Sequence, residues 1–494
     1  MNTSPILLTL LLSLPLAVTT LPGLQAQARK GHSVAKTARY VGQRPPELGV
    51  EFHRGRRKAL MKALGSGIIL MRGGVTPASN RPFVQEHNFF YLTGVRDPGC
   101  ELLLVPETGD EILFVPPHNP MTARWEGASL QAGEKGEKKT GIAKVMAATT
   151  LQKRSSYFAE VAAALERCGE DKTIWICFAP EEISSGSPDY LGRYARSRKR
   201  DVLDGRGDRA DAFRAALQKL YGETAKIKDL SRTIYALRAI KTPEEIELIR
   251  YVSEIACLGH AEAIKACRPG QLESELAAVA DYTFRRNGAQ AIGYSAIVGS
   301  GPNGNVLHHW RNNRVMEKGD NVVMDFAPEI DCYTSDVTRT FPVGGRFTRE
   351  NRKLVQDVWD AQQAIIKAVR PGVSFRDLSR IGSKLLVSRG YKPGVHILHG
   401  PCHFVGMAVH DPSGGKRTLE PGMVITVEPG AYIVEEKRGC RIEDVILVTE
   451  NGCEVLSQGC PSKPDAIEDL MKRQGLAEPP RGADAPKARS RSKL

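Results

Sequence analysis

Acidic side chains at the ends of apolar, strand-like segments are the feature that most constrains how this chain folds. Glu428 ends the apolar run 424–427, which is typical of a strand buried on both faces. A buried carboxylate is costly unless a cation pairs with it, so Glu428 needs a positive partner nearby. Glu443 repeats the pattern beside Arg441, although a salt bridge could satisfy either of these two residues. The fold must therefore bring positive charge to the ends of its buried strands.

Two aspartates belong to the same group of strand-associated acids. Between Asp325 and Asp336 lie Pro328 and Asp331, residue types that can turn one strand into the next. Side chains alternate along a strand, so Asp336 and Thr338 share a face of the second strand. Neighbouring strands would thereby direct two carboxylates into one space. A lone aspartate is more often a turn or edge residue, and only the grouping supports a functional interpretation.

Three of the histidines that precede the apolar run at 424–427 are candidates for the same site. His399 and His403 are four residues apart, a spacing that on a helix would direct both rings at one ion. Gly400 and Pro401 argue against that helix, so His403 is interpreted as a ligand from a strand or loop. His399 is the alternative ligand. The third ring, His410, lies further along the chain. For each ring taken alone, a hydrogen-bonded structural role is the favoured alternative.

Taken together, these positions predict a metal site. The candidate ligands are Asp325, Asp336, His403, Glu428 and Glu443. Four carboxylates and one imidazole are more than one divalent ion needs, so the sequence predicts two ions, and such ligands suit manganese, cobalt or zinc. Two ions about 3.5 to 4 Å apart would share a water, lower its pKa and hold it as hydroxide against a carbonyl. The predicted reaction class is metal-assisted hydrolysis.

The first half of the chain has the pattern of an α/β domain. Helix-like stretches such as 157–167 alternate with short apolar runs at 68–71, 102–105 and 112–115. From residue 181 to about residue 228 the composition becomes polar, glycine-rich and charged, which predicts a junction. Within this junction, the basic run 196–200 is interpreted as an exposed loop rather than a phosphate site.

A helix start separates this half from the next. Thr242 can cap the helix, Pro243 suits its first position, and Glu245 completes a capping box. Apolar residues recur at helical spacing from Ile246 onward. Beyond residue 292, strands are predicted at 322–325, 333–341, 423–428 and 441–448, and helices at 354–369 and 378–388. This mixture predicts an α+β domain whose strands carry the candidate ligands.

The two ends of the chain differ from its body. Residues 1–28 contain no charged side chain and include an apolar stretch too short to span a membrane, which predicts a signal peptide and an exported, periplasmic or secreted protein. A basic neck (29–49) follows this segment, and a basic tail (469–494) forms the C-terminal end of the sequence. Residues 29–58 carry a net +7 and residues 475–494 a net +3, which leaves +3 of the total +13 for the body. This distribution argues against nucleic-acid binding, and no other segment is apolar enough to cross a membrane.

Ten cysteines are spread along the chain. None forms a C-x-x-C pair, which argues against a thiolate zinc site. In a chain of 494 residues they do not amount to a disulfide scaffold, and the sequence assigns no bridge.

The order and spacing of several motifs resemble those of the aminopeptidase P and prolidase family, the pita-bread metallopeptidases. In the second half the matching stretches are 297–301, 307–308, 323–325, 335–341, 399–403, 409–411, 419–423, 427–430 and 441–444. In the first half, 88–94 and 125–127 resemble the N-terminal domain of the same family. The resemblance implies an α/β N-terminal domain over 50–228, followed by an α+β pita-bread catalytic domain over 229–468.

This resemblance also implies how the metal ligands are shared. Asp336 and Glu443 would bridge two manganese ions. Asp325 would chelate one of them, and His403 with Glu428 would bind the other.

The catalytic residues implied by the resemblance surround these ligands. Glu428 would also carry the proton from the bridging water. His308 and His410 would steady the substrate carbonyl and its tetrahedral intermediate. His399 and Arg441 match positions that line the same pocket.

Two stretches depart from the family pattern. After Asp325 the family usually has a small pair, but here Phe326-Ala327-Pro328 follows. Between His399-Gly400 and His403 it usually has smaller residues, but here the pair is Pro401-Cys402. Neither change removes a ligand, and both are expected to alter the shape of the pocket.

The implied activity is removal of the N-terminal residue that precedes a proline, with proline-containing peptides as substrates. A prolidase, which accepts only Xaa-Pro dipeptides, is the near alternative, because the sequence does not reveal whether a group holds a free carboxylate. A non-catalytic peptide-binding module on the same fold is the alternative from another class, although such relatives characteristically lack the ligands present here. The resemblance further implies a homo-oligomer, either a dimer or a tetramer.

Overall fold

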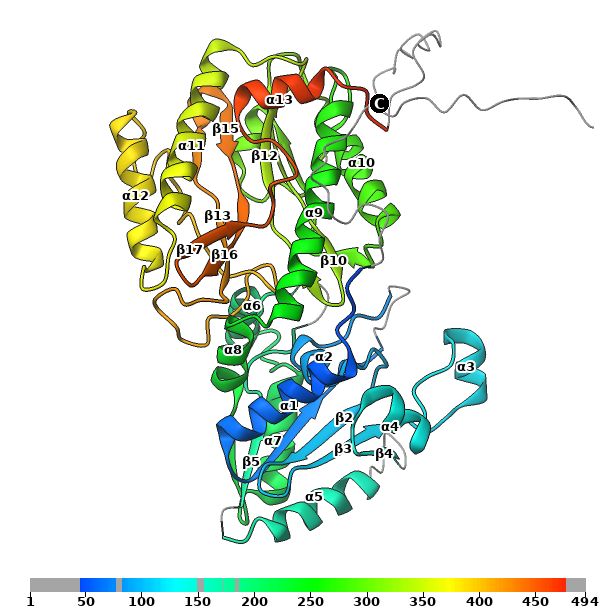
Figure 1. Ribbon diagram of the computed structural model, residues 1–494. Helices are drawn as coiled ribbons and strands as arrows, with labels where there is room; N and C mark the ends of the chain where they lie inside the picture. Colours follow the sequence, from blue (N-terminus) through cyan, green and yellow to red (C-terminus); the bar gives the residue numbers. More distant parts are fainter. Residues whose placement is uncertain (1–44, 77–81, 149–154, 171, 183–185, 477–494) are drawn as a thin grey trace, which may run out of the picture. The chain divides into compact units, whose positions relative to one another are not determined.

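The computed structural model describes residues 45–76, 82–148, 155–170, 172–182 and 186–476 (Figure 1). The signal peptide expected at 1–28, most of the basic neck and most of the basic tail lie outside these residues. Among the described helices, none is both long enough and apolar enough to cross a membrane. All ten cysteines lie within the described ranges, and none is bonded to another.

A six-stranded mixed sheet forms the first half of the structure, in the order β4-β3-β2-β1-β5-β6. Its strands are β1 (Ile68–Arg72), β2 (Glu101–Val105), β3 (Asp110–Val115), β4 (Lys144–Ala147), β5 (Thr173–Ile176) and β6 (Lys226–Asp229). Strands β1, β2 and β3 pair antiparallel, whereas β4, β5 and β6 join in parallel. The three apolar runs predicted as strands are therefore confirmed.

Alternation along these strands divides the core between the two faces of the sheet. On β1, Ile69 and Met71 belong to one buried cluster, and Ile68 and Leu70 belong to the other. The helices between residues 50 and 167 are α1 (Val50–Leu64), α2 (His87–Thr93), α3 (Pro120–Glu126), α4 (Glu134–Thr140) and α5 (Ser155–Arg167). Helix α5 confirms the helix expected at 157–167, so this half is the α/β domain that the sequence predicted.

The polar segment after residue 181 is more regular than a junction. It contains α6 (Pro188–Arg200), α7 (Arg209–Tyr221) and strand β6, which pairs with β5 and completes the sheet. The loop expected at 196–200 is wrong, because these residues form the C-terminal end of α6. Arg and Lys are good helix formers, and their charges are favourable near a helix C-terminus.

The helix predicted after Thr242 is confirmed. Helix α8 (Ser231–Ala239) precedes it, and α9 (Pro243–Ala266) and α10 (Glu273–Arg286) form an antiparallel pair. Thr242 Oγ1 accepts the N–H of Glu245, and the Glu245 carboxylate accepts the N–H of Thr242, which is the predicted capping box.

The strands of the second half form several short antiparallel sheets. Their orders are β12-β9-β8, β11-β10-β7, β13-β16-β17 and β14-β15. The strands are β7 (Ala291–Ile292), β8 (Ile297–Ser300), β9 (Asn321–Asp325), β10 (Pro328–Ile330), β11 (Tyr333–Thr334), β12 (Thr338–Pro342), β13 (Val424–Val427), β14 (Gly430–Ile433), β15 (Arg438–Arg441), β16 (Asp444–Thr449) and β17 (Gly452–Val455). Two 3₁₀ turns, Gly301–Asn305 and Val434–Glu436, connect some of them.

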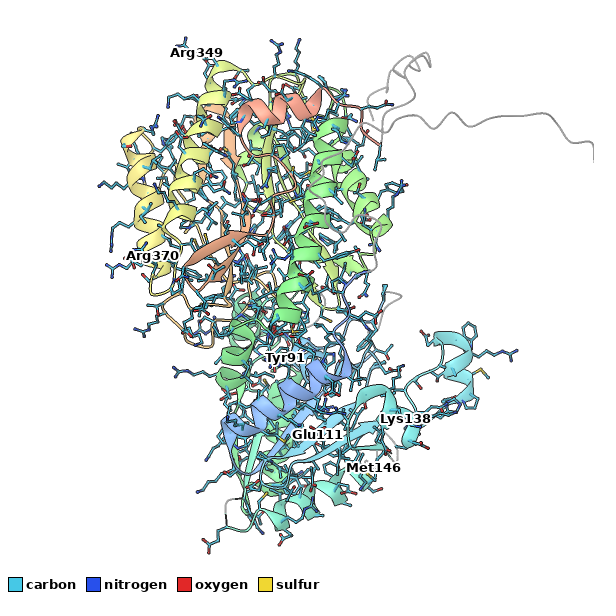
Figure 2. The ribbon with its side chains drawn as sticks, viewed as in Figure 1. Tyr91, Glu111, Lys138, Met146, Arg349 and Arg370 are labelled. Carbon is cyan, nitrogen blue, oxygen red and sulfur yellow. The ribbon has the colours of Figure 1, made fainter. Side chains whose placement is uncertain are left out.

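Helices flank these strands on two sides. In Figure 1, α9 and α10 lie on one side of the strands, and α11 (Arg349–Ala368) and α12 (Phe375–Ser388) lie on the other. Figure 2 labels Arg349 at the start of α11 and Arg370 just beyond its end. Helix α13 (Pro464–Met471) packs against α9. The α+β class and the two helices expected near 354–369 and 378–388 are therefore confirmed.

Two predicted strands are interrupted where they carry ligands. The strand expected at 333–341 divides into β11 and β12, and Asp336 lies in the gap between them. The strand expected at 441–448 divides between β15 and β16, and Glu443 lies in that gap. Since an interruption lets one residue leave the alternating pattern, strand parity alone does not determine where these two carboxylates point.

Candidate metal centre

A cavity of about 740 Å³ opens among the strands of the second half, and α6 of the first half forms part of its wall. All the catalytic and ligand candidates line it, namely His308, Asp325, Asp336, His399, His403, His410, Glu428, Arg441 and Glu443. The structure thus brings together every site residue proposed from the sequence.

Asp325 and Asp336 approach each other from neighbouring parts of one sheet. Asp325 ends β9 and is paired in register with Thr338, the first residue of β12. Tyr294 Oη lies 2.6 Å from Asp325 Oδ1 and 2.7 Å from Asp336 Oδ1. A hydroxyl has one proton to donate, so one of these two contacts requires a protonated carboxyl group.

Glu443 is held from the opposite strand. Its backbone N–H donates to Thr338 O at 3.0 Å, and Thr338 Oγ1 donates to Glu443 Oε2 at 2.6 Å. Arg441 Nε donates to Thr338 Oγ1 at 3.1 Å, and Arg441 Nη2 donates to Asp325 Oδ2 at 2.6 Å. The salt bridge considered between Arg441 and Glu443 therefore does not form, and Arg441 pairs with Asp325 instead.

His403 presents one ring nitrogen to the carboxylates. The residue lies outside any helix, and its backbone N–H donates to Thr426 Oγ1 at 3.0 Å. Its Nδ1 lies 2.9 Å from the carbonyl oxygen of Phe404, so this nitrogen carries a proton. Its Nε2 lies 3.3 Å from Asp336 Oδ2, 3.4 Å from Glu428 Oε1 and 4.0 Å from Glu443 Oε1.

Burial and mutual repulsion separate the acidities of the four carboxyl groups. Burial and the neighbouring carboxylates hold the pKa of Asp336 and of Glu443 well above their usual values. The same causes, burial first and Glu443 second, raise the pKa of Glu428 to about 8. Burial would also raise the pKa of Asp325, but the Arg441 guanidinium and the Tyr294 hydroxyl outweigh it and hold this pKa below its usual value. Asp325 is thus the anion of the group.

These donor groups fit divalent cations. Asp336, His403 and Glu443 each offer an atom within 4.8 Å of the others. Glu443 Oε1 is buried and has no hydrogen-bond donor among the described residues. A buried carboxylate oxygen without a donor is costly, and a cation bound to the group would remove that cost. Asp325 and Glu428 complete the set that would hold the ions.

Metal affinity is expected to rise with pH. At neutral pH without metal, a proton occupies Glu428, whose pKa is about 8, and the pKa values of Asp336 and Glu443 are raised in the same direction. An ion binds the deprotonated carboxylates, so raising the pH from about 6 toward the Glu428 pKa of about 8 reduces the competition from protons. Calorimetric titration with manganese in buffers of different ionisation enthalpy should show tighter binding and fewer released protons at the higher pH. An affinity that does not change over this range would contradict the assignment.

Three histidines line the cavity beside the carboxylates. His399 Nε2 lies 2.9 Å from Tyr432 Oη, and burial followed by the charge of Arg441 lowers the pKa of His399 to about 4. The ring of His308 stacks on Trp310 with centroids 5.7 Å apart, and burial lowers its pKa. The ring of His410 lies 4.3 Å from that of His403, between centroids. Two of the three rings are therefore biased toward the neutral form.

Two tyrosines belong to the site but were not identified from the sequence. Tyr294 connects the two aspartates, and Tyr432 connects His399 to Arg441, whose Nη1 donates to Tyr432 Oη at 3.1 Å. Each tyrosine lies near or within a short strand whose sequence is typical of a hydrophobic core. No local pattern distinguishes them, because their partners come from distant parts of the chain.

The departures from the family pattern have unequal effects. Phe326 is buried, packs on Phe284 with ring centroids 5.0 Å apart and does not line the cavity. Pro328 pairs in β10 with β7, and Pro401 only accepts the N–H of Glu428 through its carbonyl. Cys402 does line the cavity. The expected change of pocket shape thus rests on this one side chain.

A cavity that ends in four carboxylates and one imidazole, on a two-domain α/β and α+β fold, defines a metal-dependent hydrolase. Residues 247–450 match metallopeptidase family M24, and residues 53–166 match the N-terminal domain of aminopeptidase P. The Xaa-Pro aminopeptidase of Escherichia coli strain K12 is 31% identical over 457 residues, which cover 85% of this chain and 97% of that protein. The chain belongs to metallopeptidase family M24.

Other relatives agree with this assignment. The mitochondrial intermediate cleaving peptidase 55 of Arabidopsis thaliana is 31% identical over 461 residues, covering 87% of this chain and 84% of that protein. The structure of Pseudomonas aeruginosa aminopeptidase PepP superimposes on this chain with a TM-score of 0.71 and 28% sequence identity. The match covers 86% of this chain and 99% of the PepP chain. The two matched domains leave residues 167–246, which include α6, between them.

Proposed function

We propose that this protein is a metal-dependent aminopeptidase that removes the N-terminal residue of peptides whose second residue is proline. The observation that carries the proposal is the convergence of the five candidate ligands at the cavity, together with three histidines and Arg441. The 31% identity between this chain and the Xaa-Pro aminopeptidase of Escherichia coli supports the same activity. A donor set of carboxylates with one imidazole favours manganese over softer ions.

Two divalent ions held by these ligands would polarise a carbonyl and activate a water molecule at neutral pH. The chain's own groups then complete the hydrolysis of the peptide bond. Glu428 faces the cavity with its carboxylate 3.4 Å from His403 Nε2 and 3.7 Å from His399 Nδ1. From there it accepts a proton from the attacking water and delivers it to the proline nitrogen as the C–N bond breaks.

The histidines and Arg441 orient the substrate. His308 and His410 face the cavity and can donate hydrogen bonds to the carbonyl oxygen, whose negative charge increases in the transition state. Arg441 is fixed by Asp325, Thr338 and Tyr432, and Tyr432 in turn fixes His399. This chain of hydrogen bonds keeps one wall of the pocket rigid, which is what selection of a cyclic residue requires.

The function is tested with three synthetic peptides after addition of manganese. Release of the first residue from Xaa-Pro-Yaa is expected, and kcat/KM for the matched Xaa-Ala-Yaa should be lower by about 100-fold. A chelator should abolish the activity, and added manganese should restore it. Cleavage of the Xaa-Pro dipeptide alone would favour a prolidase. Peptide binding without cleavage, by protein that carries no metal, would favour the non-catalytic module.

We further propose an exported protein that assembles from identical subunits. The apolar leader at 1–28 supports export, and the family resemblance supports a dimer or tetramer. N-terminal sequencing of the secreted or periplasmic fraction and light scattering of the purified protein test these two points. A mature chain that retains Met1, or a monomer at micromolar concentration, would contradict them.

A further inference from the structure

Helix α6 lies against the active-site cavity although it buries none of its own residues. Its N-terminal part contributes Tyr190, Leu191 and Tyr194 to the cavity wall, preceded by Gly186 and Ser187. Tyr190 and Tyr194 are four residues apart and therefore share one face of the helix. The part of α6 that lines the cavity is therefore separate from the hydrophobic core.

The start of α6 holds His410 from two directions. Ser187 Oγ accepts the backbone N–H of His410 at 3.2 Å. Asp189 Oδ2 lies 3.2 Å from His410 Nδ1 and accepts a hydrogen bond from it. With Nδ1–H held by Asp189, Nε2 is the ring atom left to meet a substrate, and it donates to a carbonyl oxygen when both ring nitrogens carry a proton.

Tyr190 covers the two histidines that face the carbonyl position. Its ring stacks on His410 with centroids 5.2 Å apart and planes at 28°, and meets His308 edge-on at 6.2 Å. The Arg193 guanidinium lies 4.4 Å from the centre of the same ring and forms an ion pair with Asp189 at 3.3 Å. These contacts hold the Tyr190 ring in place although 38% of its surface is exposed.

The exposed aromatic surface increases toward the cavity opening. Tyr194 is 64% exposed and Trp310 is 62% exposed, whereas Asp325, Asp336 and Glu443, which line the same cavity, are buried. The peptide bond that is cut must lie beside these metal ligands, where the water is activated. Since one residue is removed, the proline and the residues after it must extend toward the opening. Exposed aromatic rings on this path suit contact with an apolar ring.

We propose that α6 forms the subsite for the leaving part of the substrate. Tyr190 packs on the proline ring and determines specificity, Tyr194 contacts the residue that follows the proline, and Asp189 is a positioning residue that acts through His410. This inference rests on the proposed function and adds to it the residues that recognise the leaving peptide.

Steady-state kinetics on Xaa-Pro-Yaa test the role of Tyr190. Tyr190→Ala is expected to raise KM about 10-fold with little change in kcat, because the ring contributes binding rather than chemistry. It should also weaken inhibition by a product dipeptide that begins with proline. Tyr190→Phe keeps the ring and should restore both values. Tyr282→Ala removes a comparably exposed tyrosine from α10 and should change neither.

The role of Asp189 is tested by a different kinetic signature. Asp189→Ala is expected to lower kcat roughly 10- to 100-fold with KM nearly unchanged, because His410 loses its orienting partner. Asp189→Glu should recover part of kcat, and Asp201→Ala, at the other end of α6, should have no effect. If Asp189→Ala lowers kcat and raises KM by similar factors and also lowers the melting temperature, the role of Asp189 is merely structural. That result would overturn this assignment.

The outcomes separate the two proposals. If wild-type protein releases no residue from any peptide, the proposed function fails. If wild type is active and Tyr190→Ala binds substrate and product as tightly as wild type does, only the inference about α6 is overturned. Because α6 buries no residue, these variants are expected to fold, and thermal melting checks this directly.

Discussion

Asp336→Asn is expected to lower kcat/KM by about 1,000-fold, equivalent to about 4 kcal/mol of transition-state stabilisation. The carboxylate of Asp336 lies 3.3 Å from His403 Nε2 and shares Tyr294 with Asp325, so it contributes to the centre of the ligand group. The substitution keeps the shape of the side chain but removes an anionic ligand. Activity assays and metal analysis of the purified variant should show that both are lost together.

Stability separates this effect from misfolding. The pKa of Asp336 is held well above its usual value by burial and by the nearby carboxylates, so removing the acid does not destabilise the metal-free protein. Wild type should gain thermal stability on addition of manganese, whereas Asp336→Asn should gain little. Asp281→Asn, at an exposed ion pair on α10, serves as the control with wild-type behaviour. An Asp336→Asn variant that keeps full activity would refute the metal centre.

Asp411→Ala is expected to destabilise the fold by about 3–5 kcal/mol. Asp411 accepts from Arg238 Nη2 at 2.6 Å and from Lys241 Nζ at 3.1 Å. Arg238 also pairs with Glu182 of the first half at 2.9 Å, and these four side chains are at most 1% exposed. Removal of Asp411 would leave Lys241 with no carboxylate within this group. Urea unfolding followed by circular dichroism measures the loss.

An exposed ion pair provides the control for this prediction. Arg167 and Asp110 lie 3.3 Å apart with side chains 42% and 45% exposed. Asp110→Ala should therefore cost no more than about 1 kcal/mol. If the two alanine variants unfold at the same urea concentration, the buried group does not stabilise the contact between the two halves. Asp411 also follows His410 directly, so a loss of activity is expected to accompany the loss of stability.

Local patterns predicted most of the fold. The apolar runs at β1, β2 and β3 and the capping box at Thr242 depend on neighbouring residues only, and the structure contains each of them. The four acidic ligand candidates could also be found, because carboxylates grouped at the ends of apolar strands are unusual enough to need an explanation. The division of the chain into an α/β half and an α+β half follows from the same periodicities.

Long-range contacts set the limit of prediction. The gaps that contain Asp336 and Glu443 depend on how β12 meets the neighbouring strands, which no local pattern describes. Tyr294 is linked to its carboxylates only by the folded arrangement. The loop prediction at 196–200 fails because the charged composition of this run resembles that of a solvated connection. The contact of α6 with His410 spans more than 200 residues of sequence.

The absence of buried residues on α6 has an evolutionary consequence. Substitutions in a core usually reduce stability, so a recognition surface built from core residues can change only slowly. On α6 the side chains that face the cavity contribute little to the stability of the fold. Substrate preference can therefore drift in this protein almost independently of thermal stability. A library randomised at 190, 191 and 194 would explore new peptide preferences while most of its members remain folded.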